Sequence, residues 1–198
     1  MNKHDLRVIK TKQILKKALL RLLGTTPLEK MKIAELCREA NISRGTFYLH
    51  YETIEDLFEE YYAEIMDDMR KSYLEPLKIA KLVESKKIEP AMIRIFHHIK
   101  NYERFYRICF SNKIPMAYYY MLFEQISALL RIDLISYDKN GMDTGYTTAF
   151  HANAIIGIII EWYRRDFQDS AEQVSEQLVK IVNLHYKSSD RESIRVNL

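Results

Sequence analysis

Ile33-Ala-Glu-Leu-Cys-Arg-Glu-Ala-Asn-Ile-Ser-Arg-Gly-Thr-Phe-Tyr-Leu-His-Tyr51 is the stretch that decides the fold of the first part of this chain. Its first half repeats apolar residues at helical spacing, which predicts a short amphipathic helix. Asn41 follows at a position suited to left-handed backbone angles, and Ser43 is placed to cap a second helix. Two short helices joined by a tight turn are typical of a helix-turn-helix DNA-binding motif.

The second helix of this motif divides its side chains between the core and the outside. Phe47 and Tyr51 are four residues apart and point to the core, so the other face is free for DNA. Arg44 can donate two hydrogen bonds to a guanine edge, and Thr46 can bind phosphate or touch a thymine methyl group. The candidate DNA-binding residues are Ser43, Arg44, Gly45, Thr46, Tyr48 and His50. For the last two, an exposed helix face with packing duties is the alternative.

The segment from Leu36 to Tyr51, with the acidic helix start and Leu57-Phe58 that follow it, resembles the DNA-binding segment of the TetR family of bacterial regulators. The resemblance covers roughly residues 8–60. It implies a three-helix head, a linking fourth helix, an all-helical ligand domain and a dimer. It also implies that Tyr48 and His50 contact phosphate and that Gly45 lets the backbone approach DNA.

Three positions depart from the family pattern. Asn41 stands where glycine is usual, Lys32 where a threonine usually caps the first motif helix, and Ile54 where a lysine often contacts phosphate. The change at Ile54 removes one expected DNA contact. These departures keep open a rival function, a TetR-like co-activator or adaptor that acts through protein contacts without binding an operator.

Composition and charge agree with a helical DNA-binding protein. The 198 residues are 47% hydrophobic, which excludes a disordered chain. With 5 Gly, 4 Pro and no run of alternating β-branched residues, the expected class is mainly α. Residues 1–51 contain 11 Lys and Arg against 4 Asp and Glu, a net charge of +7; the rest contains 19 against 23, a net of −4. A basic head on a mildly acidic body fits a module that binds a polyanion.

Helical periodicity divides the chain into three parts. We expect a DNA-binding domain over residues 1–53, a helical effector-binding and dimerisation domain over 54–186, and a polar tail over 187–198. A helix from near Val8 to Leu23 precedes the motif, and a long helix begins at a capping box of Thr53 and Asp56 and ends before Pro76. Residues 137–141 have the composition of a loop.

The last two expected helices carry the prediction of a homodimer. The helix over residues 144–167 is apolar on nearly all sides, so it must be covered on more than one face. Paired with the helix that follows it, it could form a four-helix interface about a two-fold axis. A central helix buried within one subunit is the alternative. The expected interface residues are Ala152, Ile155, Ile159, Trp162, Val174 and Leu178.

No motif indicates an enzyme, a cofactor or a metal site. The sequence contains no glycine-rich nucleotide loop, no His-Glu-x-x-His and no Gly-x-Ser-x-Gly. Cys37 and Cys109 lie in apolar helical contexts, which favours the reducing cytosol, and no segment reaches the ~20 apolar residues of a membrane span. Dense aromatic residues between Tyr102 and Phe123 suggest a helical core or an apolar effector pocket. We therefore expect a cytoplasmic, ligand-responsive repressor that binds a double-stranded DNA operator.

Overall fold

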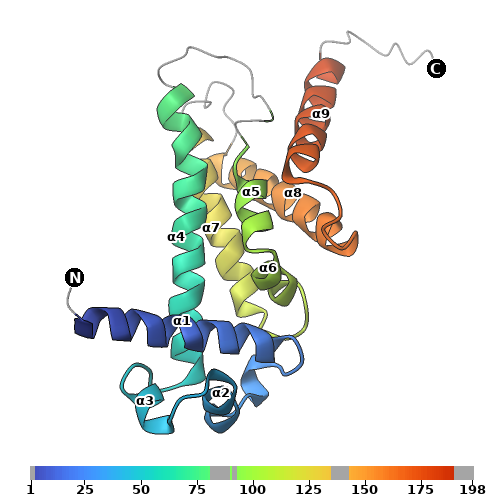
Figure 1. The fold of residues 1–198 in the computed structure, drawn as a ribbon. Helices are drawn as coiled ribbons and strands as arrows, with labels where there is room; N and C mark the ends of the chain where they lie inside the picture. The colour runs from blue at the N-terminus through green and yellow to red at the C-terminus, as the bar shows by residue number, and fades with distance from the viewer. Residues whose placement is uncertain (1–2, 81–89, 91–92, 135–142, 190–198) are drawn as a thin grey trace, which may run out of the picture.

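The structure, a computed structural model, describes residues 3–80, 90, 93–134 and 143–189 (Figure 1). These residues form helices and connecting turns and contain no strand, so the expected mainly α class is confirmed. The loop expected at 137–141 lies outside the described residues, as does most of the tail expected from residue 187. Residues 187–189 belong instead to the last helix.

The head is built from α1 (Lys3–Leu23), a 3-10 turn η1 (Leu28–Lys30), α2 (Ile33–Ala40) and α3 (Arg44–Tyr48). α1 begins five residues earlier than expected and crosses the lower part of the long helix α4 in Figure 1. The helices α1, α2 and α3 each contribute fully buried side chains to the apolar interior of the head. These include Leu19, Leu36 and Phe47.

α4 (Ile54–Ala80) connects the head to the body. Its capping box forms as expected: the Thr53 amide donates to Asp56 Oδ2 at 2.8 Å, and the Asp56 amide donates to Thr53 Oγ1 at 3.1 Å. The prediction that α4 ends before Pro76 is wrong, because the helix continues to Ala80. A proline has a φ that fits a helix, and near the C-terminal end it removes only one backbone hydrogen bond.

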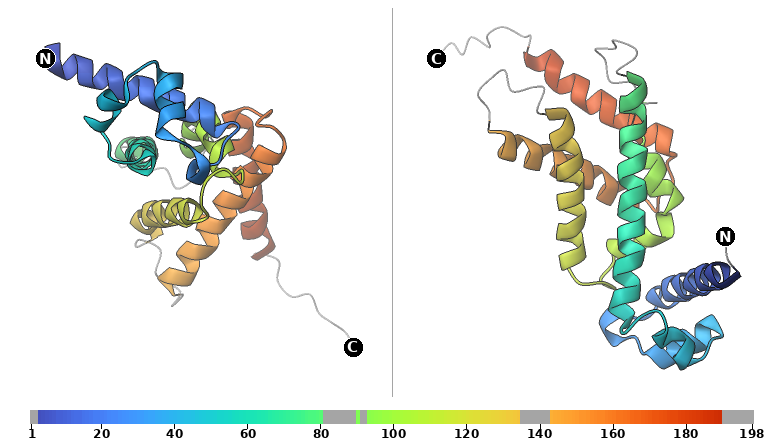
Figure 2. Two further views of the ribbon diagram at one scale, coloured as in Figure 1. Left: turned by 90° about the horizontal axis from the view of Figure 1, so that it is seen from below. Right: turned by 90° about the vertical axis from the view of Figure 1, so that its left-hand side faces the viewer.

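The body consists of α5 (Ile95–Asn101), α6 (Glu103–Cys109), α7 (Ala117–Leu134), α8 (Thr144–Arg164) and α9 (Ala171–Ser189). α7 packs along α8, and α5 contacts both α4 and α9. Both views of Figure 2 place α8 and α9 on the side of the body away from α3. The recognition part of the motif and the last helix pair therefore occupy different regions of the molecule.

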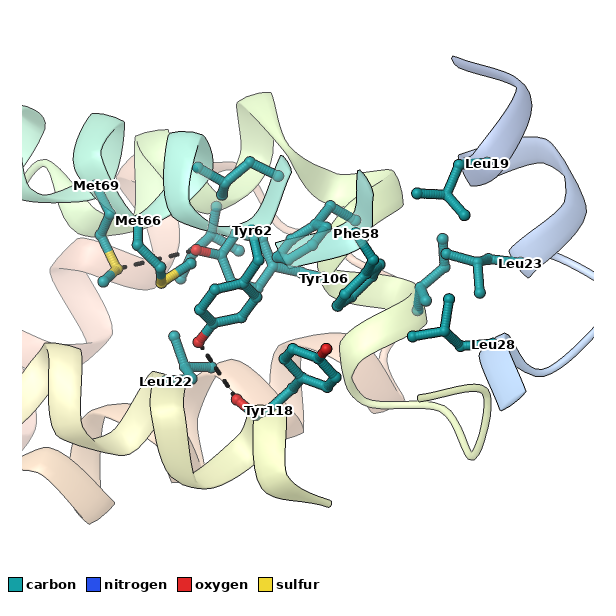
Figure 3. Packing of buried hydrophobic residues seen from close by; sticks show 14 of the residues in the cluster. Leu19, Leu23, Leu28, Phe58, Tyr62, Met66, Met69, Tyr106, Tyr118 and Leu122 are labelled. Carbon is teal, nitrogen blue, oxygen red and sulfur yellow. Dashed lines mark hydrogen bonds between the residues drawn. The ribbon is translucent and has the colours of Figure 1, made fainter. Parts of the chain in front are cut away.

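The hydrophobic core runs without a break from the head into the body (Figure 3). Leu23 of α1 and Leu28 of η1 lie at the head end of this core, and Phe58 and Tyr118 belong to α4 and α7. The Phe58 and Tyr118 rings are 4.7 Å apart between centroids, in an edge-to-face arrangement that aromatic pairs favour. Tyr62 adds a polar contact, since its hydroxyl donates to the Tyr118 carbonyl at 3.3 Å.

A buried histidine joins α4, α5 and α6. His98 Nδ1 is 2.9 Å from Asp68 Oδ2, and its Nε2 is 3.0 Å from the Tyr106 hydroxyl. Burial lowers the pKa of His98, and Asp68 opposes that shift only in part. The neutral ring therefore donates its Nδ1 proton to the carboxylate and accepts from Tyr106. The histidine is a satisfied core residue that fixes three helices around one polar group.

The α8–α9 turn is strained and held from outside. Asp166 and Phe167 have φ angles of 60° and 52°, which are uncommon for residues other than glycine. Arg107 pairs with the Asp166 carboxylate at 2.5 Å and donates to its carbonyl at 2.8 Å. Lys100 donates to the Phe167 carbonyl at 2.7 Å. Side chains from α5 and α6 thus fix the direction in which α9 leaves α8.

Four of the residues expected in the dimer interface are buried inside one chain, which corrects their assignment. Ala152, Ile159, Trp162 and Val174 are at most 5% exposed. Trp162 packs edge-to-face on Phe96 of α5 at 6.1 Å, and its Nε1 donates to the Asp169 carbonyl at 3.0 Å. Ile155 and Leu178 are half-buried. Because α8 is apolar on nearly all sides, its sequence does not reveal which side faces the core of its own chain. In the structure, the side that carries Trp162 faces that core.

Candidate nucleic-acid interface

The turn between α2 and α3 has the geometry expected from its sequence. Asn41 has φ 52° and ψ 47°, the left-handed conformation predicted for it. The Ile42 amide donates to the Cys37 carbonyl at 3.0 Å and closes the end of α2. An asparagine can take this conformation at a lower cost than most residues, so the usual glycine is not required here.

Ser43 caps α3 as predicted. Its Oγ accepts from the Thr46 amide at 3.0 Å and lies 2.8 Å from the Thr46 hydroxyl. Both hydroxyls are therefore already engaged with each other at the start of the helix. Phe47 is fully buried, which places the opposite side of α3 toward solvent.

The structure brings the predicted DNA-binding residues together along α3 and the residues that flank it. Arg44, Gly45 and Ser43 are exposed, and Tyr48 is 58% exposed. Thr46 and His50 are half-buried. The Tyr48 ring packs edge-to-face on Phe47, with 5.6 Å between the ring centroids, and more than half of the residue remains exposed. The surface offers a cation, a phenol and an imidazole, which suits a phosphate backbone and base edges.

Glu60 of α4 attaches the recognition segment, which is α3 with the residues that follow it up to Tyr51, to the rest of the head. Its Oε1 accepts from the Tyr51 hydroxyl at 2.8 Å and pairs with Lys16 at 2.8 Å, while its Oε2 pairs with Lys12 at 2.5 Å. Lys12 also lies 5.1 Å from the centre of the Tyr51 ring. One carboxylate thus joins α1, α4 and the residue that follows the recognition helix by three positions.

The charge of Glu60 is stabilised by these partners. Burial alone would raise the pKa of Glu60, but the hydrogen bonds from Lys12, Lys16 and Tyr51 outweigh it and lower that pKa to about 2. Burial and the hydrogen bond to Glu60 raise the pKa of Tyr51, which therefore stays a donor. The contact is an ionised acceptor with three donors at neutral pH.

The sequence departures at Lys32 and Ile54 have structural consequences. Lys32 stands at the N-cap of α2 and its side chain makes no capping hydrogen bond. Ile54 is 4% exposed and belongs to the core, so its side chain does not face a phosphate. Neither departure disturbs α3, whose cap and buried anchor are complete.

One exposed residue on this surface was missed by the sequence reasoning. Leu49 directly follows α3, keeps helical backbone angles (φ −69°, ψ −15°) and is 80% exposed. It lies four residues after Gly45, so helical spacing alone could have placed it on the outward face. The predicted set contained only polar residues and glycine, so the apolar Leu49 was left out.

Groups of metal ligands and membrane-spanning helices are absent from the part of the chain that the structure describes. Among residues 3–80, 90, 93–134 and 143–189, no group of three or more His, Cys, Asp or Glu could hold a metal ion. None of the described helices has the length and apolar character to cross a membrane.

Arg21 of α1 is paired with Glu39 of α2, which removes one cation from the free charge of the head.

Two family models match the chain. The model for bacterial regulatory proteins of the tetR family matches residues 14–61, and a model for the C-terminal region of transcriptional regulators, TetR_C_8, matches residues 86–184. Together they span the head, the linking helix and most of the body. No curated protein sequence gives a significant match.

Solved structures of transcriptional regulators share the fold. The dihydroxyacetone kinase operon activator DhaS is 20% identical, with 91% of this chain and 98% of that chain covered and a TM-score of 0.57. The fatty acid degradation regulator FadR from Bacillus halodurans is 12% identical, with 86% and 93% covered and a TM-score of 0.60. A protein described as a fatty acid metabolism regulator of Clostridium perfringens is 14% identical, with 84% and 94% covered and a TM-score of 0.60.

Replacing Glu60 by Gln should lower the free energy of unfolding by about 1–2 kcal/mol at pH 7, allowing for solvent screening of a side chain that is a third exposed. A depressed carboxyl pKa adds stability that is complete above the unfolded value of 4.5 and is lost as pH falls toward 2. The difference between parent and E60Q should therefore shrink over that range in urea titrations. Glu59→Gln, an exposed neighbour, is the control, and a difference that is constant with pH would contradict the role of Glu60.

Proposed function

The chain belongs to the TetR family of bacterial transcriptional regulators, and we propose that it is a homodimeric, ligand-responsive repressor that binds a specific operator in the cytoplasm. In this proposal residues 1–53 bind DNA and residues 54–186 bind an effector and dimerise. The repressor role follows the simplest action of an operator-bound dimer, which is to exclude other proteins from the same DNA.

The outward face of α3 is the observation that carries the proposal. Arg44 and Tyr48 are exposed although the helix they belong to is anchored by a fully buried Phe47. Neither side chain is needed to hold α3 in place, since Ser43 caps the helix and Tyr51 is tied to Glu60. Side chains that the fold does not use, on the basic part of the chain, support contact with DNA.

An adaptor without operator binding is less well supported. That reading would draw on the uncapped Lys32 and on Ile54, whose side chain is in the core. Both changes lie outside α3 and leave Arg44 exposed at its first position. The loss of a phosphate contact at position 54 weakens binding to every sequence equally, so it does not remove specificity.

The outer face of α8 supports the dimer in place of the stripe expected from sequence. Phe150, Ala154 and Gly157 follow one another at helical spacing and are exposed, with Phe150 at 68%. A Cβ added at Gly157 would meet no atom within 4 Å, so nothing in the same chain needs this glycine. Half-buried Leu178 on α9 adds to the apolar surface. A large side chain beside small ones suits close approach of a second helix.

A groove beside the head supports ligand response. It has a volume of about 550 Å³ and lies between the α6–α7 connection and the C-terminal part of α8. The connection touches the head directly: the Lys113 carbonyl accepts from the Leu28 amide at 2.9 Å, and Lys113 Nζ donates to the Thr25 carbonyl at 3.2 Å. The lining is mostly apolar and aromatic, with Ser111, Asn112 and one cation, Arg164, as polar members; the aromatic and aliphatic side chains include Phe110, Ile114, Tyr119, Ile160 and Tyr163. It suits an aromatic or apolar anion.

Selection of DNA sites from a random pool with the parent protein should yield a near-palindrome. Arg44→Ala should then weaken binding by about 1–3 kcal/mol and relax preference at one position per half-site. Tyr48→Phe should weaken binding to all sequences about equally, because phosphate contacts do not distinguish bases. The measurements are Kd values at matched salt. Selection of no site, with purely non-specific and salt-dependent binding, would support the adaptor instead.

Light scattering of the parent at micromolar concentration should give about twice the 23.6 kDa mass of one chain. Ala154→Asp should shift it toward monomer without unfolding it, because residue 154 is exposed in a single chain and becomes a buried charge only in the dimer. Gln125→Asp on the exposed side of α7 is the control. A substitution at fully buried Ile159 would test folding instead of assembly. A monomeric parent would remove this interface.

The groove can be tested with anilinonaphthalene sulfonate, an aromatic anion whose fluorescence rises in apolar sites. Arg164→Gln should weaken its binding roughly two- to fivefold, as expected for an exposed ion pair. Arg131→Gln, another exposed arginine, should leave the binding unchanged. Saturation with the dye should lower operator affinity in the parent. Equal dye binding by all three proteins would exclude this groove as the effector site.

A further inference from the structure

Leu49 is the one residue on the outward face of the recognition segment whose chemistry the proposed function does not yet use. It is 80% exposed, although most exposed residues around it are polar. Helical backbone angles continue through it, so it shares a face with Gly45 and Thr46, which lie four and three residues earlier. Phe47, the buried anchor, points the other way.

The fold itself has no use for a leucine at this position. A side chain with four-fifths of its surface in water gains little from burial, and a polar residue there would serve the monomer equally well. The contacts that hold the segment come from other residues: Phe47 is buried, Ser43 caps the helix, and Tyr51 binds Glu60. Leu49 is therefore free to make a contact outside the chain.

The space in front of Leu49 is also open. Gly45 has no side chain, and a Cβ built on it would meet nothing nearer than Ser43 Oγ at 3.7 Å, so the fold does not require a glycine there. Thr46 is half-buried with its hydroxyl 2.8 Å from that of Ser43. Leu49 is thus the side chain that projects from the middle of this face.

The major groove offers a leucine one apolar feature, the C5-methyl group of thymine. Resting on the proposed function, we infer that Leu49 is a specificity-determining residue that contacts the methyl group of one thymine in each operator half-site.

The test uses the full-length dimer and the operator obtained by site selection. Each thymine is replaced in turn by deoxyuracil, which removes the methyl group and keeps base pairing. For the parent, one position in each half-site should lose affinity roughly three- to fivefold, the effect of one buried methyl group. Leu49→Ala loses the contact in both half-sites, so it should bind the unmodified operator roughly 10- to 25-fold more weakly. It should show no loss at that position, while its sensitivity elsewhere is kept.

Two control variants separate Leu49 from its neighbours. Thr46→Ser removes the threonine methyl and keeps the hydroxyl near Ser43, and it should leave the uracil pattern unchanged. Met121→Ala removes an exposed apolar side chain from α7 of the body and should change neither affinity nor pattern. Thermal unfolding of Leu49→Ala should match the parent.

The outcomes distinguish the two proposals. If the parent selects no site, both the proposed function and the role of Leu49 fail. If it selects a site that lacks thymine, shows no methyl dependence, or keeps that dependence in Leu49→Ala, the role of Leu49 alone fails. If Thr46→Ser loses the sensitivity to uracil at that position, the methyl contact belongs to Thr46. A Leu49→Ala variant that binds DNA as the parent does would leave Leu49 as a surface for a protein partner, which also overturns the inference.

Discussion

The ionised carboxylate of Glu60 is the contact on which the geometry of the DNA-binding head depends. α3 has only five residues, which is too short to be stable by itself in water. Its direction is therefore set by what holds its two ends. Ser43 fixes the first end through a local hydrogen bond, whereas Tyr51 fixes the other through Glu60, which also binds Lys12 and Lys16 of α1. The recognition helix is oriented by one charge shared among three elements.

This division of labour leaves the outward face of α3 without structural duties. Phe47 supplies the packing and the two ends supply the hydrogen bonds, so residues such as Arg44, Tyr48 and Leu49 can vary with little effect on folding. Members of a regulator family can then differ in the operator sequence that they bind while the head keeps its structure. The two sets of residues stay separate because residues three or four apart lie on the same face of a helix, so buried and exposed positions occupy opposite faces.

The turn and the helix caps of the head could be predicted from neighbouring residues, whereas the outward side of α8 could not, because it depends on tertiary packing. The left-handed Asn41, the Ser43 cap and the capping box of Thr53 depend on neighbours within four residues, so the sequence contained all the information they need. The interface side of α8 depends on which helices pack against it, and an apolar pattern on all sides cannot supply that; Trp162 faces its own core. Leu49 lies four residues after Gly45, so helical spacing could have predicted its outward position, but the predicted set contained only polar residues and glycine.

The connection between α6 and α7 links the body to the head by a different kind of contact from Glu60. The Lys113 carbonyl binds the Leu28 amide, so backbone of the body meets backbone of η1, directly before α2. Such a contact does not depend on side-chain identity and moves only if the connection itself moves. The same connection forms one wall of the groove that contains Tyr163 and Arg164. In the proposed dimer, a ligand that widened this groove would shift the connection, and the backbone contact between Lys113 and Leu28 would carry the shift to η1 and α2. Because Glu60 keeps α3 attached to α1 and α4, each head would then turn as a unit, and the spacing of the two heads would change.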